Sequence, residues 1–237
     1  MSNKLQRWKL AQRYESNWWR DNIHYLSTEY YAKTAEDIRV LFNRFDNLSS
    51  STHILEVGTG ACGILSFLYE SSVRYGIDPL EDYYAGIAKV QEIRQPGVQY
   101  LAAKGEDIPF NDEMFDLIIV DNVLDHCESP EAVMREIKRV LKSGGKLYFR
   151  QNTYTLYGKL VRWLMEQLLI DKGHPFTFRK KELAYIFANM KLRVVYYNRN
   201  GYWTTWKKEI QSKSLKDKIK ALLLVTRDKT EYFLISE

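Results

Sequence analysis

Residues 53–63 read His-Ile-Leu-Glu-Val-Gly-Thr-Gly-Ala-Cys-Gly, an apolar run that leads into a cluster of glycines. Ile54, Leu55 and Val57 are typical of a buried parallel strand that ends in a tight turn. The apolar residues of Ile64–Tyr69 predict a helix packed on that strand. Glycines let a ligand approach the backbone closely, and the first N–H groups of the helix can bind it. The stretch therefore predicts half of a nucleotide-binding unit, with an ordinary strand–helix turn as the alternative.

Two cofactors fit this spacing of glycines. Gly58, Gly60 and Gly63 match G-x-G-x-x-G, and Asp78 follows about twenty residues later, as in dinucleotide-binding folds. The same residues match the loop that binds S-adenosylmethionine (SAM) in methyltransferases. Glu56 favours SAM, because a carboxylate at this strand end attracts a positively charged amino-acid moiety and repels a pyrophosphate.

The composition indicates one large α/β domain with an accessory segment. The chain has 237 residues, of which 45% are hydrophobic, enough for a sizeable core. Cys62 and Cys127 are the two cysteines, and they indicate neither a disulfide framework nor a metal site. Residues 1–10 lack the apolar segment of a signal peptide, and no apolar run is long enough for a membrane span. We therefore expect a cytoplasmic protein.

The net charge of +5 is unevenly distributed along the chain. Residues 150–237 contain 18 Lys and Arg against 8 Asp and Glu, a net charge of +10, whereas residues 1–149 carry −5. A basic segment of this kind can face nucleic acid, an anionic lipid surface or an acidic substrate, although most basic runs are simply solvated faces.

The remaining pattern divides the chain into an extension and a core. Residues 1–50 predict aromatic-rich helices that either pack on the core or form a lid, and residues 51–237 predict the α/β domain, with insertions at about 154–178 and 201–228. Further strands are predicted at Val73–Asp78, Val98–Ala103, Phe115–Val120, Lys146–Phe149, Leu192–Tyr197 and Tyr232–Ser236. Helices are predicted at Tyr83–Ile93, at Glu131–Leu141 with Ser143-Gly144-Gly145 as its end, at Leu156–Ile170 and at Lys181–Met190. Such alternation indicates a doubly wound sheet.

A series of motifs follows in order along about residues 52–150. They are Leu55-Glu56-Val57-Gly58-Thr59-Gly60, Gly76-Ile77-Asp78, Gly105-Glu106-Asp107-Ile108-Pro109-Phe110, Phe115-Asp116-Leu117-Ile118, Val123-Leu124-Asp125-His126 and Arg139-Val140-Leu141-Lys142-Ser143-Gly144-Gly145-Lys146-Leu147. With them the chain resembles the class I SAM-dependent methyltransferases, in the branch with the methyltransferase type 11 pattern. A dinucleotide-binding protein would account for the first two motifs alone.

The resemblance implies a fold and a cofactor. The fold is a Rossmann-like, mostly parallel sheet of seven strands with an antiparallel last strand, here preceded by a helical extension. The cofactor is SAM, with contacts from Glu56, Gly58, Thr59, Gly60, Asp78, Pro79, Leu80, Gly105, Glu106, Asp121 and Asn122.

The family also implies a part for each contact. Glu56 would hold the methionine amino group, and Asp78 would take the ribose hydroxyls. Gly105 and Glu106 would border the adenine, and Asp121 and Asn122 would lie under the methionine and sulfonium. Asp78 can also cap the helix that follows Pro79.

Two positions depart from the family pattern. Cys62 stands where the family has the third glycine of the loop, unless the loop shifts to Gly63. Lys104 stands where the family often has an acid or amide that reaches the adenine amino group, and lysine cannot accept that hydrogen bond. Adenine contacts would then come from the backbone and from Glu106.

Methyl transfer from a sulfonium needs alignment and a dry site, and a general base only if the acceptor must lose a proton. His126, after the fourth strand, and His174, in the Asp171–Phe178 loop, are the candidates for such a base. Structural roles are the alternatives for both. Cys127 is a nucleophile by residue type only.

The acceptor is expected to be a small molecule. A nucleic-acid-modifying enzyme is the alternative suggested by the basic segment with Arg199, Trp203 and Trp206. No nucleic-acid partner is expected, however, because no base-methylating Asn-Pro-Pro-Tyr motif follows the fourth strand. A non-catalytic SAM-binding protein is the third hypothesis, suggested by Cys62 and Lys104.

In a doubly wound sheet the ligand lies beyond the carboxyl ends of the strands. The motif loops there are used by the cofactor, so added segments must enclose the acceptor. We expect two such segments: the aromatic region around Tyr14, Trp18 and Trp19, and the loop Lys172–Phe178 with His174 facing inward.

Overall fold

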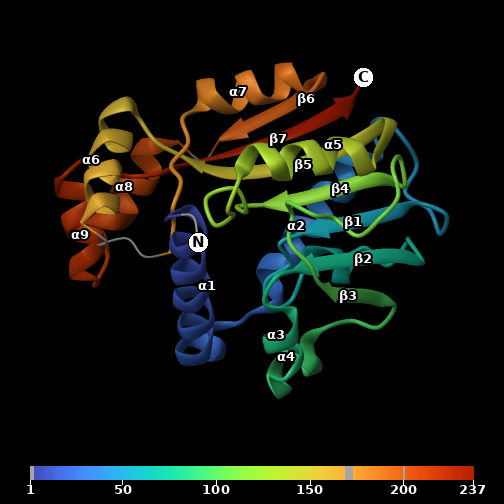
Figure 1. Ribbon diagram of the computed structural model, residues 1–237, viewed down its shortest axis with the longest axis horizontal. Coiled ribbons are helices and arrows are strands. Elements are labelled where there is room, and N and C mark those ends of the chain that lie inside the picture. Colours follow the sequence, from blue (N-terminus) through green and yellow to red (C-terminus); the bar gives the residue numbers. More distant parts are fainter. Residues whose placement is uncertain (1–2, 169–172, 200) are drawn as a thin grey trace.

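The computed structural model describes residues 3–168, 173–199 and 201–237. A seven-stranded sheet with the order β3-β2-β1-β4-β5-β7-β6 forms its centre (Figure 1). The strands are β1 (His53–Val57), β2 (Val73–Asp78), β3 (Val98–Ala102), β4 (Phe115–Asp121), β5 (Leu141–Thr153), β6 (Leu192–Arg199) and β7 (Asp228–Ser236). The first five pair in parallel, and β7 runs antiparallel to both β5 and β6. The predicted sheet, with its antiparallel last strand, is confirmed.

Helices cover both faces of the sheet (Figure 1). They are α1 (Asn3–Asn22), η1 (Ile23–Tyr25), α2 (Thr28–Phe42), η2 (Ile64–Phe67), α3 (Glu81–Ala85), α4 (Ala88–Ile93), α5 (Pro130–Val140), α6 (Leu156–Gln167), α7 (Lys180–Asn189), α8 (Tyr202–Gln211) and α9 (Leu215–Leu222). No helix of the described residues is long and apolar enough to cross a membrane.

Side chains of the central strands alternate between two cores because successive residues of a strand point to opposite faces. In β4, Ile118 and Val120 pack with α5 and α7, whereas Leu117 and Ile119 pack with α2, η2 and α4. All four of these side chains are fully buried. A strand buried on both faces reads as the continuous apolar run that the sequence shows.

The helix predicted at Ile64–Tyr69 was wrong, because that segment forms only the short 3-10 helix η2. Its first N–H groups bind the Glu56 carboxylate, and the carbonyls of Leu65 and Ser66 accept hydrogen bonds from Arg74. Both ends of the helix are thus satisfied within one turn, so a longer helix is not needed to pair its backbone groups.

Two other boundaries differ from the prediction. The helix expected at Tyr83–Ile93 is split into α3 and α4 around Gly86. Helix α5 ends at Val140, before the predicted stop at Ser143-Gly144-Gly145. These glycines lie instead in β5, where the register with β4 shifts and Gly144 adopts a φ of 72°. A bulge with a left-handed residue favours glycine, so the glycines shape the strand and not the end of the helix.

Candidate active site

A cavity opens at the carboxyl ends of β1, β2 and β4, where the topology places ligands of doubly wound sheets. Its wall contains every residue that the resemblance assigned to the cofactor, namely Glu56, Gly58, Thr59, Gly60, Asp78, Pro79, Leu80, Gly105, Glu106, Asp121 and Asn122. Helices α1 and α2 close the cavity from outside the sheet with Trp8, Gln12, Glu15, Trp19, Tyr30 and Tyr31. The structure therefore brings the predicted residues together, while their contacts with SAM stay a prediction.

The glycine loop after β1 has the conformation that the sequence suggested. Gly58 and Gly60 have φ angles of 74° and 56°, and the Gly58 N–H donates to the Ile77 carbonyl at 2.8 Å. A Cβ on Gly58 would lie 2.5 Å from a methyl group of Val123. Gly63, with a φ of 85°, supplies the third left-handed position, so the loop uses Gly63 where Cys62 departs from the pattern.

Glu56 is buried at the base of the cavity. Its two oxygens accept hydrogen bonds from the N–H groups of Ile64, at 3.0 Å, and Leu65, at 2.8 Å. Burial raises the pKa of Glu56 to about 8, although these hydrogen bonds act in the opposite direction. A cationic group in the cavity would favour the ionised form.

Asp78 ends β2 and lines the same cavity. Its carboxylate accepts hydrogen bonds from the N–H groups of Leu80, at 2.8 Å, and Gly60, at 2.9 Å. Burial raises the pKa of Asp78 to about 6. The predicted helix cap at Asp78 was wrong, because α3 begins at Glu81 with Leu80 as its N-cap, and the bond from the Leu80 N–H closes a turn before the helix. This bond is compatible with a ribose contact, because each carboxylate oxygen has two lone pairs.

Asp121 ends β4 in an ion pair that the sequence analysis missed. Arg150 Nε donates to Asp121 Oδ1 at 2.6 Å, and the Tyr30 hydroxyl donates to Oδ2 at 2.7 Å. Burial acts to raise the pKa of Asp121, but the hydrogen bond and positive charge of Arg150 outweigh it and lower the pKa. Asp121 and Arg150 are directly paired on neighbouring parallel strands, so strand alignment could have revealed the contact.

Asn122 turns the chain out of β4 with a φ of 58°. Its side-chain oxygen accepts hydrogen bonds from the Asn152 N–H at 3.0 Å and from Gln151 Nε2 at 3.2 Å. The residue is therefore fixed to β5 beside the ion pair of Asp121.

The Lys104–Glu106 segment forms another wall of the cavity. Glu106 Oε1 accepts the N–H groups of Glu128, at 2.6 Å, and Ser129, at 3.0 Å, which ties this loop to the start of α5. The Lys104 ammonium lies 3.9 Å from the centre of the Trp8 ring and 3.4 Å from a Glu128 oxygen. Lys104 is thus directed to α1 and Glu128.

Helix α1 presents one face to the cavity through Trp8, Gln12, Glu15 and Trp19, which recur at helical spacing. Gln12 Oε1 is buried without a hydrogen-bond partner. Of the three aromatic residues expected to roof the site, Trp19 is among the described lining residues and Tyr14 and Trp18 are not. No signal in the sequence fixed which side of this helix would face inward.

His126 lines the cavity, and its ring lies 4.6 Å from that of His174, centre to centre. His174 itself is not among the described lining residues, and Lys172 of the predicted roof lies outside the described residues. Cys127 is buried, and its thiol lies 3.1 Å from the Leu124 carbonyl. Burial raises the pKa of Cys127, so the thiol form is favoured and a nucleophilic thiolate is not.

Comparison with known proteins agrees with the resemblance to methyltransferases that the sequence motifs indicated. Residues 55–149 match the model of a methyltransferase domain family. The chain is 39% identical over 93 residues to an uncharacterised protein of Methanocaldococcus jannaschii, covering 39% of this chain and 41% of that protein. It is 35% identical over 77 residues to a demethylmenaquinone methyltransferase of Streptomyces griseus, covering 31% and 34%. The chain thus spans less than half the length of these curated relatives.

The whole fold is similar to that of a solved geranyl diphosphate C-methyltransferase from Streptomyces coelicolor. The TM-score is 0.66 at 14% identity, over 87% of this chain and 79% of that one. At this identity the likeness shows the fold alone. Together with the family match, it confirms the resemblance to class I methyltransferases.

Proposed function

We propose that this chain, which carries a methyltransferase domain at residues 55–149, is an enzyme that transfers a methyl group from SAM to a small-molecule acceptor. The observation that carries the proposal is the single cavity wall shared by the glycine loop and the three acids Glu56, Asp78 and Asp121. SAM, when bound, supplies an electrophilic methyl group on a sulfonium.

The residues of the cavity fit the chemical groups of SAM. Asp78 can accept the ribose hydroxyls, and buried Glu56 can offset the charge of the methionine ammonium. Gln12 Oε1, a buried acceptor without a partner, suits a donor such as the adenine amino group. Gln12 therefore offers the acceptor that Lys104 cannot supply.

The acceptor side of the proposed reaction depends on exclusion of water and on orientation. Trp8, Trp19, Tyr30 and Tyr31 are large rings from α1 and α2 that close the cavity. His126 lines the cavity with His174 beside it, and these two are the proposed bases for an acceptor that must lose a proton. This enclosure supports a small molecule rather than a base held in a polymer.

A cytoplasmic location is part of the proposal. The two cysteines are free and buried, as in proteins of reducing compartments.

Titration calorimetry with SAM, S-adenosylhomocysteine (SAH) and NAD tests the cofactor, and a screen for transfer of a labelled methyl group to metabolite pools tests the activity. We expect SAM and SAH to bind, NAD not to compete, and a small acceptor to become labelled. Displacement of SAH by micromolar NAD would contradict the cofactor assignment. Binding of SAM without transfer to any acceptor would favour the non-catalytic alternative.

A further inference from the structure

Three side chains that can bind a metal ion meet beside the cavity, which His126 lines: Asp125, His126 and His174. One ligand atom from each lies within 4.8 Å of the other two. His126 Nε2 is 3.9 Å from Asp125 Oδ1, a separation that is too long for a hydrogen bond. No metal site was predicted from the cysteines, and the 47 residues between His126 and His174 hide this cluster in the sequence.

An unsatisfied oxygen gives independent support for a ligand at this point. Asp125 is only 5% exposed, and its Oδ1 has no hydrogen-bond partner. Its other oxygen accepts from Asn122 Nδ2 at 3.3 Å. A buried carboxylate oxygen without a partner is costly, and a cation is one means of satisfying it.

The backbone holds the three side chains together. The turn after β4 closes with a hydrogen bond from the His126 N–H to the Val123 carbonyl at 2.9 Å. The Phe176 N–H contacts the Asp125 carbonyl at 3.5 Å, which ties the segment after His174 to the same turn. The cluster is therefore built from two segments that the fold fixes against each other.

We propose that Asp125, His126 and His174 bind one divalent transition-metal ion beside the cavity. Two imidazole nitrogens and one carboxylate oxygen suit zinc, iron, manganese or cobalt better than magnesium or calcium, and three protein ligands leave positions open. The inference rests on the proposed function and deepens it: the open positions would take an oxygen of the acceptor.

Such an ion would make an acceptor hydroxyl more acidic. The hydroxyl proton would pass to water, and the acceptor oxygen would form the bond to the methyl carbon. The bond between that carbon and the sulfonium would break, its electron pair staying on the sulfur of SAH. The acceptor class is thus a small molecule with a hydroxyl that can reach this ion.

Titration of metal-free protein with Co²⁺ tests the site through the visible absorption of the bound ion. We expect one Co²⁺ per chain, and His174→Ala and Asp125→Asn to weaken its binding at least about tenfold through loss of a ligand. His24→Ala is the matched control and should leave Co²⁺ binding unchanged. Thermal melting identifies a variant that fails to fold. His174→Ala is the variant that decides whether the metal site exists, because His174 lies in a loop and its replacement should leave the fold intact.

Absence of a one-to-one complex at millimolar Co²⁺ would overturn the proposal, as would binding that His174→Ala leaves unchanged. SAH binding to the metal-free protein is measured in parallel. If SAH binds and Co²⁺ does not, the metal site fails and the proposed methyltransferase stands.

Helix α6 is amphipathic, but its apolar side chains face solvent and a charged side chain faces the protein. Arg162 of this helix is buried, and Lys159 pairs with Glu182 at 2.7 Å. Apart from Gln167, the exposed side chains of this helix are apolar and recur at helical spacing, namely Leu156, Tyr157, Leu160, Trp163, Leu164 and, just past the helix, Leu168. An apolar stripe that faces solvent marks an interaction surface.

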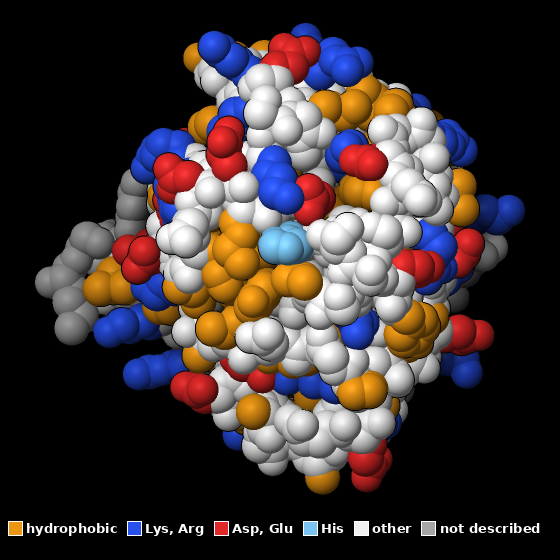
Figure 2. All heavy atoms as spheres, turned by 90° about the vertical axis from the view of Figure 1, so that its right-hand side faces the viewer, with side chains coloured by type: hydrophobic (Ala, Val, Ile, Leu, Met, Phe, Trp, Pro, Cys, Tyr) orange, Lys and Arg blue, Asp and Glu red, His pale blue; other side chains and the backbone are white. Residues whose placement is uncertain are grey.

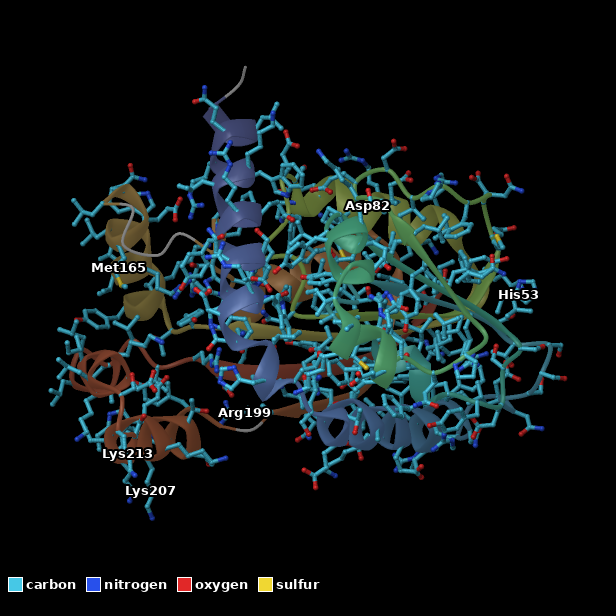
Figure 3. All side chains as sticks on the ribbon, turned by 90° about the horizontal axis from the view of Figure 1, so that it is seen from below. His53, Asp82, Met165, Arg199, Lys207 and Lys213 are labelled. Atoms are coloured by element: carbon cyan, nitrogen blue, oxygen red, sulfur yellow. The ribbon has the colours of Figure 1, made fainter. Side chains whose placement is uncertain are left out.

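Helix α9 also exposes apolar side chains, namely Leu215, Ile219, Leu222 and, just past its end, Leu223. Trp206 of α8 donates to the Ala221 carbonyl at 3.0 Å, so α8 and α9 form one unit that also exposes Trp203. Both Figure 1 and Figure 3 place α6, α8 and α9 together at one end of the molecule. We name these three helices the helical end.

The helical end is also basic. Residues 201–227 contain seven Lys and Arg against two Asp and Glu. Lys207, Lys208, Lys213 and Lys218 are exposed, and Figure 3 shows Lys207 and Lys213 at its outer edge. The opposite end of the molecule, in Figure 2, intermixes acidic and basic side chains.

We infer that the helical end binds an anionic lipid surface. Leu and Trp side chains beside exposed lysines match the interfacial region of such a membrane, which takes apolar groups below its negative headgroups. A second copy of the chain fits less well, because a two-fold interface would bring the same basic surfaces against each other.

Sedimentation with vesicles tests this surface. We expect binding to vesicles of phosphatidylcholine with phosphatidylglycerol, and at least about tenfold weaker binding to phosphatidylcholine alone, since each lysine near an anionic surface adds affinity. Trp163→Ser with Leu160→Ser should abolish binding, whereas Tyr69→Ser, an exposed aromatic residue outside the helical end, should not.

Equal binding to neutral vesicles, or none to anionic ones, would overturn the inference. Light scattering supplies the competing outcome: a dimer that the Trp163→Ser, Leu160→Ser variant dissociates would assign the surface to a second copy instead.

Discussion

Two buried carboxylates of the cavity, Glu56 and Asp78, hold their protons more tightly in the folded chain than in the unfolded one. Their pKa values are raised to about 8 and about 6, because burial disfavours the charged forms. Such groups stabilise the fold fully at low pH, and this contribution is lost as pH rises through the folded pKa values. A ligand cation near Glu56 would relieve that loss.

Glu56→Gln tests this linkage. Between about pH 5 and 8 the free energy of unfolding of the wild type should fall more steeply than that of the variant, because Gln cannot ionise. Urea unfolding at several pH values measures both slopes. Parallel slopes would show that Glu56 does not titrate in this range.

Asp78→Ala should weaken SAH binding by roughly 1–3 kcal/mol, the usual cost of losing hydrogen bonds to a charged acceptor. Asp82→Ala is the matched control, since Asp82 is exposed on α3 (Figure 3). Calorimetry measures both. Unchanged affinity in Asp78→Ala, with an intact fold, would remove Asp78 from the cofactor site.

Among the elements outside the family motifs, α1 contributes the most side chains to the described wall of the cavity. Its inward face closes the cavity over β1 and β2, and Trp8 stacks its ring against the Lys104 ammonium. Arg7 on the same helix pairs with Glu166 of α6, which joins the lid to the helical end. The helix is thus held from both sides of the opening.

Gln12→Ala tests the contribution of α1 to cofactor binding. We expect a loss of about 0.5–1.5 kcal/mol in SAH affinity, the net value of one hydrogen bond, because Gln12 Oε1 would lose its ligand donor. Gln6→Ala, on an exposed position of the same helix, should have no effect. If the two variants bind SAH equally well, α1 does not contact the cofactor through Gln12.

At the scale of the whole molecule, the excess of positive charge and the cavity belong to different parts of the chain. The cavity is lined by acids at the carboxyl ends of the central strands, whereas the excess of positive charge lies in the last third of the chain. A polymer bound along that basic segment would therefore not by itself bring a base into the cavity.

We expect no tight, salt-sensitive complex with tRNA or duplex DNA. Filter binding at 50 and 200 mM salt measures this, because release of counterions makes true nucleic-acid complexes weaken steeply with salt. Nanomolar binding that falls with salt, together with methyl transfer to the polymer, would favour the nucleic-acid alternative over a small acceptor.

The sequence by itself determined where the strands lie along the chain and which loops follow them. Local patterns carry this information: the apolar run of β4, the glycines after β1 and the acid that ends β2 each act on immediate neighbours. That these loops meet at one cavity was predictable for the same reason, since parallel strands bring their carboxyl ends to one edge. The limits of η2 and β5 were not, because Arg74 and the bulge at Gly144 act through tertiary contacts.

Only the tertiary structure decided what meets that edge from elsewhere in the chain. Which face of α1 turns inward depends on how it docks, because aromatic residues lie on more than one side of it. The pairing of Tyr30 with Asp121 and the approach of His174 to His126 span 91 and 48 residues. A periodic sequence pattern describes only residues within one element, so it cannot predict contacts over such separations. The packing of the extension and the insertions therefore sets the acceptor side of the site.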